Sequence, residues 1–211
     1  MRGLLFDLDG TLVDTNYLHT LAWARALRDA GEDAPMNAVH RLVGMGGDQL
    51  VPRLLGHECE EAAARRPERY RELMGDARPF DRAVELLRAC RGLGLEVVIA
   101  TSAPKDELEP MMDLLEHQAD RVTSADDVER SKPDPDVFVK ANEGLERAIV
   151  VGDSVWDVEA ARAAGLGCIG VETGGFSRHE LAEAGAMHVY RDVGVLLDQL
   201  HVGPIATLVG P

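Results

Sequence analysis

Two aspartates, Asp7 and Asp9, stand one residue apart directly after the apolar run at residues 4–6, and Gly10 and Thr11 follow them. Such a run predicts a buried strand, where an unpaired ionised carboxylate is costly. Carboxylates gathered at one place also repel one another unless a cation is bound. Mg²⁺ prefers oxygen ligands and commonly takes one or two carboxylates together with a substrate phosphate. The start of the chain therefore predicts a Mg²⁺ site at the end of the first strand.

Further polar side chains follow other apolar runs. Thr101 and Ser102 follow one such run, Asp153 follows another, and Asp157 comes four residues later. Lys132 supplies a cation in a connecting segment just before a predicted helix. Ligands bind beyond the carboxyl ends of the strands in open α/β sheets, so we expect these side chains to meet there. For Asp153 alone, a helix N-cap is an equally simple interpretation.

The elements that must position these residues alternate along most of the chain. Continuous apolar runs predict strands that are covered on both faces, and helical patterns lie between them. This order predicts an α/β fold with a doubly wound, mostly parallel, Rossmann-like sheet. The predicted strands are 3–8, 95–100, 147–151 and 167–171, and the predicted helices are 80–94, 134–145 and 157–167.

One segment interrupts the alternation. Residues 16–78 show helical spacing, and no strand-like run appears before residue 95. Residues 15–79 carry nine Arg and ten Asp or Glu, a net charge of −1, whereas the remainder carries 13 basic and 27 acidic residues, a net charge of −14. We therefore expect a catalytic core made of residues 1–14 and 80–211 and an inserted all-helical cap domain at 15–79. The apolar tail at 203–211 shows no pattern that assigns it.

The overall composition excludes several kinds of partner. The net charge of −15 repels nucleic acid and anionic membranes. No apolar run reaches the length of a membrane helix, and Asp7 and Asp9 interrupt the first one. The three cysteines lack CxxC spacing, which favours buried reduced thiols. We expect a cytoplasmic protein with a small phosphorylated metabolite as its partner; monomer and homodimer both stay open.

Four segments resemble a known family. In order along the chain they are "DLDGTLVDT", "ATSA", "SKPDPDVF" and "GDSVWD". They are similar to the four motifs of the haloacid dehalogenase-like (HAD) superfamily, and most of all to its phosphoglycolate phosphatase and β-phosphoglucomutase-like branch. The resemblance covers nearly the whole chain apart from the tail.

The resemblance implies a role for each motif residue. Asp7 would be the nucleophile that forms an aspartyl-phosphate, and Asp9 would protonate the leaving alkoxide and then activate water. Mg²⁺ would be bound by Asp7, the main-chain carbonyl of Asp9 and Asp153, with Asp157 supporting that site or Lys132. Thr101 and Lys132 would hold the transferring phosphoryl oxygens. The residues expected to contact phosphate or the rest of the substrate are Gly10, Thr11, Thr101, Ser102, Ala103, Lys132, His19, Gly44, Gly46 and Gly47.

The implied activity is Mg²⁺-dependent hydrolysis of a small phosphomonoester, either a sugar phosphate or a phosphoglycolate-like compound. Halide-displacing relatives typically lack an aspartate at the position of Asp9. Phosphonate-cleaving relatives use a cap lysine, whereas the three lysines of this chain lie outside the expected cap: Lys105, Lys132 and Lys140. Substrate specificity would lie in the cap around residues 42–51, where the glycines suggest a flexible loop.

Two other functions stay open. A β-phosphoglucomutase-like sugar phosphomutase is one, because His19 falls where such enzymes carry a helper histidine. Against it, Gly152 replaces an acidic residue of those mutases, and Gly47 stands about where they place an arginine that grips the second phosphate. Arg41, Arg53, Arg65, Arg66 and Arg69 could substitute for that arginine. The other function is a non-enzymatic phospho-receiver or regulatory binding module, although receivers lack both a helical cap and an acid/base such as Asp9.

Overall fold

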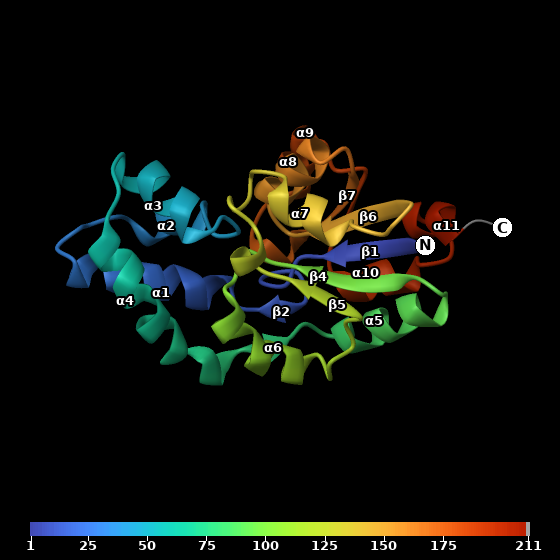
Figure 1. Ribbon diagram of the computed structural model, residues 1–211, viewed down its shortest axis with the longest axis horizontal. Coiled ribbons are helices and arrows are strands. Elements are labelled where there is room, and N and C mark those ends of the chain that lie inside the picture. The colour runs from blue at the N-terminus through green and yellow to red at the C-terminus, as the bar shows by residue number, and fades with distance from the viewer. Residues whose placement is uncertain (210–211) are drawn as a thin grey trace.

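A six-stranded parallel sheet forms the centre of the protein (Figure 1). The computed structural model describes residues 1–209. The strand order is β5-β4-β1-β6-β7-β8, and every neighbouring pair is parallel. The chain therefore winds outward from β1 to one edge and then to the other. The strands are β1 (Arg2–Phe6), β4 (Glu96–Ala100), β5 (Arg121–Thr123), β6 (Arg147–Gly152), β7 (Gly167–Val171) and β8 (His188–Tyr190).

The predicted doubly wound α/β fold is confirmed, and the predicted strand at 167–171 matches β7 residue for residue. The strand predicted at 3–8 ends earlier, at Phe6, because the chain turns there into the segment that carries Asp7 and Asp9. β5 and β8 were not predicted. Each has three residues, which is too short to show a periodic pattern.

Helices cover both faces of the sheet. Alternate residues of a strand point to opposite faces, so Leu4 and Phe6 pack in one hydrophobic cluster and Leu5 packs in the other. The first cluster includes residues of α5 (Ala83–Gly92), α6 (Leu108–Leu114), α10 (Val193–Asp198) and α11 (Pro204–Val209). The second includes residues of α7 (Asp136–Ala141), α8 (Val155–Ala163) and α9 (Arg178–Ala184).

Four further α-helices lie between β2 (Val13–Asp14) and β3 (Arg78–Pro79). We call them the helical insertion: α1 (Asn16–Asp29), α2 (Met36–His40), α3 (Gly47–Leu55) and α4 (Glu60–Arg71). β2 and β3 pair antiparallel, so the expectation of no strand between the first strand and residue 95 is wrong. Two-residue strands leave no trace in a sequence pattern. In Figure 1 the arrow of β1 points toward the helical insertion, which lies at the carboxyl ends of the strands. The domain bounds 1–14, 15–79 and 80–211 stay a prediction.

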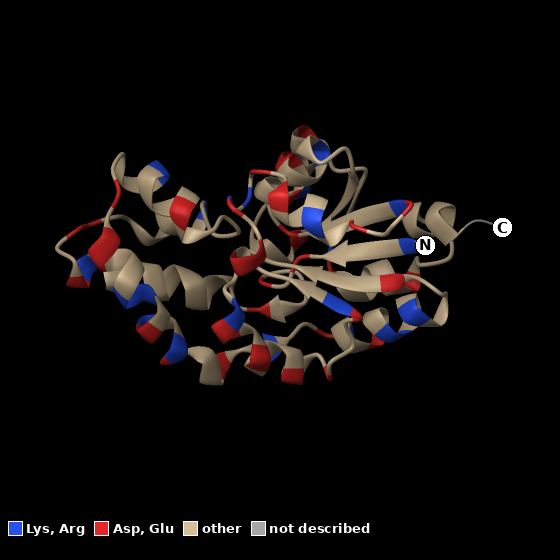
Figure 2. Cartoon of the chain, in the orientation of Figure 1, with Lys and Arg blue, Asp and Glu red and all other residues tan. Residues whose placement is uncertain are grey.

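Charged residues of both signs are mixed along the chain. In the view of Figure 2, Lys and Arg positions are interspersed with Asp and Glu positions along the helices. None of the helices in the described part of the chain combines the length and apolar character that crossing a membrane requires. Cys90 and Cys168 are buried free thiols, and Cys59 is a half-buried one.

The tail that the sequence left unassigned forms α11 over most of its length, and residues 210–211 lie outside the described part. Ile205 and Leu208 are buried in the cluster that includes α5 and α10. The tail therefore belongs to the hydrophobic core.

We expect Leu208→Ala to lower the free energy of unfolding by about 2–4 kcal/mol, because it leaves a cavity where the side chain is now only 2% exposed. Urea denaturation of the purified chain measures the change. Val202→Ala is the matched control: Val202 is 80% exposed, and its truncation should stay within about 0.5 kcal/mol. A loss below about 1 kcal/mol in Leu208→Ala would contradict a structural role for α11.

Candidate active site

The carboxyl ends of three central strands bring the predicted residues together. Asp7 directly follows β1, and its backbone N–H donates to the carbonyl of Val151 at 2.9 Å, which ties the residue to β6. Thr101 directly follows β4, and Asp153 directly follows β6. Lys132 reaches the same place from the segment before α7. These residues lie up to 146 positions apart in the chain. Because the strands are parallel, their carboxyl ends lie at the same end of the sheet, and the residues meet there.

Three carboxylates and one ammonium form a buried cluster. Oxygens of Asp7, Asp153 and Asp157 all lie within 4.8 Å of one another. Lys132 Nζ donates to a carboxylate oxygen of Asp7 and to the carbonyl of Ala100, and it lies 2.9 Å from Asp157 Oδ1. The side chains of Lys132 and Asp157 are completely buried. One positive charge therefore faces three carboxylates at a place that solvent hardly reaches.

The pKa values show what this imbalance does. Burial, reinforced by the charge of Asp157, raises the pKa of Asp153 to about 7. Burial raises the pKa of Asp7 well above its ordinary value, although Lys132 opposes the shift. Burial lowers the pKa of Lys132, but the two carboxylates next to it outweigh that effect and raise it. A divalent cation bound by these oxygens would relieve the excess negative charge, so the cluster fits a hard metal ion.

Asp153 is held in place on all sides. Thr11 Oγ1 donates to its Oδ1 at 2.7 Å, and Asn16 Nδ2 donates to its Oδ2 at 2.9 Å. Gly10 has a φ of +77°, and a Cβ there would lie 2.5 Å from Asp153 Oδ2. A Cβ on Gly174 would lie 1.7 Å from the same oxygen. Both glycines are required by close approach to this carboxylate.

The N-cap interpretation of Asp153 is wrong, because the neighbouring Ser154 caps α8. The Ser154 hydroxyl accepts from the backbone N–H of Asp157 at 3.3 Å, and Asp157 Oδ2 accepts from the Ser154 backbone N–H at 3.1 Å. This reciprocal pair is a capping box. It leaves the carboxylate of Asp153 outside the helix and fixes Asp157 beside Lys132.

Asp9 lies in a different environment from Asp7. Its Oδ1 accepts from Thr15 Oγ1 at 2.6 Å and from His19 Nε2 at 2.8 Å, and its Oδ2 lies 3.5 Å from Thr101 Oγ1. Burial raises the pKa of Asp9, but the attraction and hydrogen bond of His19 and the hydrogen bond of Thr15 prevail and lower it to about 2. The two neighbouring aspartates thus have pKa values shifted in opposite directions, which is a pattern of acid/base sites.

His19 belongs to a chain of contacts that runs through the helical insertion. An Arg66 nitrogen contacts its Nδ1, and its Nε2 lies 2.8 Å from Asp9 Oδ1. The ring stacks on Tyr70 with centroids 4.2 Å apart. Arg66 also forms an ion pair with Glu107, which lies outside the insertion in the segment after Thr101. The insertion and the sheet are therefore in contact through these side chains.

A cavity of about 280 Å³ lies between the insertion and the strand ends. Its wall includes nine of the predicted residues: Asp7, Asp9, His19, Gly44, Gly46, Gly47, Thr101, Ser102 and Ala103. The others do not belong to its wall and lie around the buried cluster or support it: Gly10, Thr11, Lys132, Asp153 and Asp157. Thr11 uses its hydroxyl on Asp153, and its expected phosphate contact stays a prediction.

The segment 42–51 is only partly the loop that its glycines suggested, because α3 begins at Gly47; the expected flexibility stays a prediction. Gly44 accepts from Ser102 Oγ at 3.3 Å, and the Gly46 N–H donates to Ser131 Oγ at 3.0 Å. A Cβ on Gly47 would lie 2.9 Å from the indole of Trp23. These glycines allow the segment to pack closely against the sheet loops and against α1.

Sequence reasoning missed several residues of the site. Thr15 ends the first motif and Asn16 directly follows it, and this proximity was a usable signal for their contacts with Asp9 and Asp153. Trp23 lines the cavity, but its spacing on α1 resembles that of any core residue. Glu107 stands among other acidic residues of its segment, and nothing in the pattern distinguishes it.

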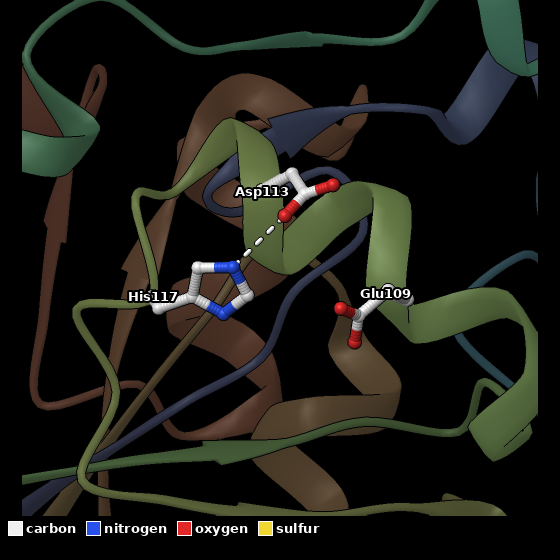
Figure 3. A group of neighbouring side chains, drawn as sticks. All are labelled: Glu109, Asp113 and His117. Carbon is white, nitrogen blue, oxygen red and sulfur yellow. Dashed lines mark hydrogen bonds and ion pairs between the residues drawn. The ribbon is translucent and has the colours of Figure 1, made fainter.

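A second group of potential metal ligands lies on α6 and the turn after it (Figure 3). Glu109, Asp113 and His117 are exposed, and His117 Nε2 lies 2.8 Å from Asp113 Oδ1. Side chains spaced by four residues meet on a helix surface without any ligand. We assign this group no function.

Comparisons with known proteins agree with this architecture. The chain is 32% identical over 222 residues to a validoxylamine A 7'-phosphate phosphatase of Streptomyces hygroscopicus subsp. limoneus, covering 95% of this chain and 97% of that protein. It is 32% identical over 190 residues to a phosphoglycolate phosphatase of Pseudomonas putida, covering 82% and 70%. A hydrolase structure from Pseudomonas syringae superposes with a TM-score of 0.89 at 32% identity, covering 95% and 98%. The family model of haloacid dehalogenase-like hydrolases matches residues 1–165, and the chain belongs to that family.

Proposed function

We propose that this protein is a Mg²⁺-dependent phosphatase that hydrolyses a small phosphomonoester through an aspartyl-phosphate on Asp7. One observation carries the proposal: a buried cluster of Asp7, Asp153, Asp157 and Lys132 lies beside a cavity in which a second carboxylate, Asp9, is held separately. Two similar proteins are named as phosphatases of small phosphorylated compounds, which supports the same reaction class.

In the first half of the proposed reaction, a carboxylate oxygen of Asp7 attacks phosphorus and the bond to the alcohol oxygen breaks. Asp9 gives a proton to the departing alkoxide. Lys132 and Thr101 hold the phosphoryl oxygens and offset their charge. In the second half, Asp9 takes a proton from water, which attacks phosphorus and releases phosphate and free Asp7. Two easier displacements thus replace one difficult displacement.

The environment of Asp9 suits the second half of this reaction. The hydrogen bonds of Thr15 and His19 favour the ionised carboxylate, which is the form that accepts a proton from water. For the first half Asp9 must carry a proton, a form that the same two hydrogen bonds disfavour. His19 therefore serves as a positioning residue for Asp9.

The proposed metal is Mg²⁺, which would be held by Asp7, Asp153 and the main-chain carbonyl of Asp9, with Asp157 as support. When bound, it supplies positive charge next to the transferring phosphoryl group. The proposed compartment is the cytoplasm, and the proposed partner is a small phosphorylated metabolite.

Hydrolysis is favoured over phosphomutase activity by the packing at two glycines. A side chain at Gly47 would collide with Trp23, so this position cannot carry a group that grips a second phosphate without a shift of the indole. A Cβ on Gly152 would lie 2.4 Å from the Cβ of Asp157, which excludes an acidic residue there in the present packing. Interconversion of glucose 1-phosphate and glucose 6-phosphate with a bisphosphate activator, faster than phosphate release, would establish the mutase instead.

We expect Asp7→Asn to abolish turnover, because a neutral amide is a poor nucleophile and a poor metal ligand. Phosphate release from a panel of phosphorylated metabolites with Mg²⁺ measures the effect. Asp33→Asn removes a charge of the same kind at an exposed position and should retain the wild-type rate. Undiminished turnover by Asp7→Asn would remove this residue as the nucleophile.

We expect Asp9→Asn to lower the rate by about 10²–10⁴-fold, the usual scale for a general acid/base group. Metal affinity, measured by calorimetry on the same variant, should stay near the wild-type value, because the proposed ligand of Asp9 is its main-chain carbonyl. A rate loss below about tenfold would mean that another residue moves the proton.

Removal of divalent cations with EDTA should abolish turnover, and added Mg²⁺ should restore it. Ca²⁺ should not restore it, because this larger ion takes six to eight oxygens and can engage both oxygens of Asp7, leaving none free for attack. Phosphate release by the wild-type chain at matched concentrations of the two ions distinguishes these outcomes. Full activity with Ca²⁺ alone would contradict the proposed geometry.

A further inference from the structure

The cavity has two chemically different sides. The side nearest the strand ends carries Asp7, Asp9 and Thr101, where the phosphoryl group would lie. The side made by the helical insertion is largely apolar and would contact the alcohol part of the ester. Its residues include Trp23, Val43, Met45, Leu50, Ala63 and Pro67. An indole in such a wall suits the apolar face of a ring.

One arginine, and no lysine, stands among the described residues that line the cavity. This residue, Arg66, forms an ion pair with Glu107 and donates to His19 Nδ1. Its guanidinium also lies over the ring of Tyr70, 4.6 Å from the centroid. The side chains of Arg66 and Glu107 are 11% and 7% exposed, so water screens their interaction little. The positive charge of Arg66 is therefore already neutralised.

A second anionic group on the substrate would have to take Arg66 away from Glu107. Breaking a buried pair leaves an uncompensated charge, which costs more than the pair itself contributes. Glu107 Oε2 already has no hydrogen-bond partner among the described residues, so nothing nearby is ready to stabilise the freed carboxylate. Asp48, which also lines the cavity, would repel the incoming anion.

We propose that Glu107 determines which substrates are accepted by their charge. Glu107 holds Arg66 in an ion pair, so Arg66 does not bind a second anionic group, and the cavity selects monophosphate esters of uncharged ring alcohols. Esters whose alcohol part carries a carboxylate or a second phosphate are disfavoured. This inference rests on the proposed phosphatase function and chooses between its two substrate types. It assigns this chain to sugar-type or cyclitol-type phosphates rather than to phosphoglycolate-like ones.

The test uses two pairs of esters that differ in one charged group. Glucose 1-phosphate and glucuronate 1-phosphate differ in a hydroxymethyl and a carboxylate, as do glycerol 3-phosphate and 3-phosphoglycerate. The wild-type chain with Mg²⁺ should show a kcat/KM at least about tenfold higher for the neutral member of each pair. The ratio within a pair cancels effects that act on Asp9 through His19, because they change both members alike.

Glu107→Gln should lower that ratio by about tenfold, because it frees the charge of Arg66 while keeping the shape of the side chain. Glu109→Gln, the matched control, removes a carboxylate two residues away at an exposed position and should leave the ratio unchanged. Adding Arg66→Gln to Glu107→Gln should return the ratio to the wild-type value. If Glu107→Gln does not fold, Glu107→Ala, which admits water beside Arg66, replaces it.

The outcomes separate this inference from the function on which it rests. A wild-type ratio near or below one, or a ratio that Glu107→Gln leaves unchanged, would overturn the role of Glu107 while hydrolysis stands. Absence of turnover of every ester, p-nitrophenyl phosphate included, would instead overturn the phosphatase function itself.

Discussion

The buried ammonium of Lys132 is the interaction on which the rest of the site depends. It reaches the carboxylates of Asp7 after β1 and Asp157 on α8 and the carbonyl at the end of β4, so one side chain joins two strand ends and a helix. An unpaired ammonium in that position would be expensive, and so would the carboxylates without it. The contacts of Lys132 therefore help to fix the positions of β1, β4 and α8 relative to one another, in addition to the apolar packing between these elements.

Much of the fold could be predicted from the sequence because its main strands are buried on both faces. Such strands appear as uninterrupted apolar runs, and β7 was predicted to the residue. The site residues at the strand ends could be proposed for the same reason, since parallel strands deliver their carboxyl ends to one edge. Short edge elements such as β5 carry no comparable signal, because three residues cannot show a period.

The contacts that the sequence did not reveal are those made across the cavity. Arg66 and Glu107 stand 41 positions apart, in segments where charged residues are common, and only the folded chain makes them partners. The glycines of segment 42–51 show a related limit. Their frequency suggested mobility, but each meets a particular neighbour, such as Trp23 at Gly47, that leaves no room for a side chain. Composition alone cannot distinguish a glycine that gives the backbone flexibility from a glycine that is needed because a neighbouring group leaves no room for a side chain.

The pairing of β2 with β3 has a consequence for how such a protein can change over time. β2 and β3 form a separate two-stranded sheet, in which the chain enters and leaves the helical insertion at adjacent positions, Val13 opposite Pro79 and Asp14 opposite Arg78. The two ends of the insertion are therefore held together by this pairing, whatever the number of residues between the two strands. Another set of helices could replace the insertion at this junction without any change in the distance between β2 and β3. Substrate choice can diverge there while the reacting groups stay where they are.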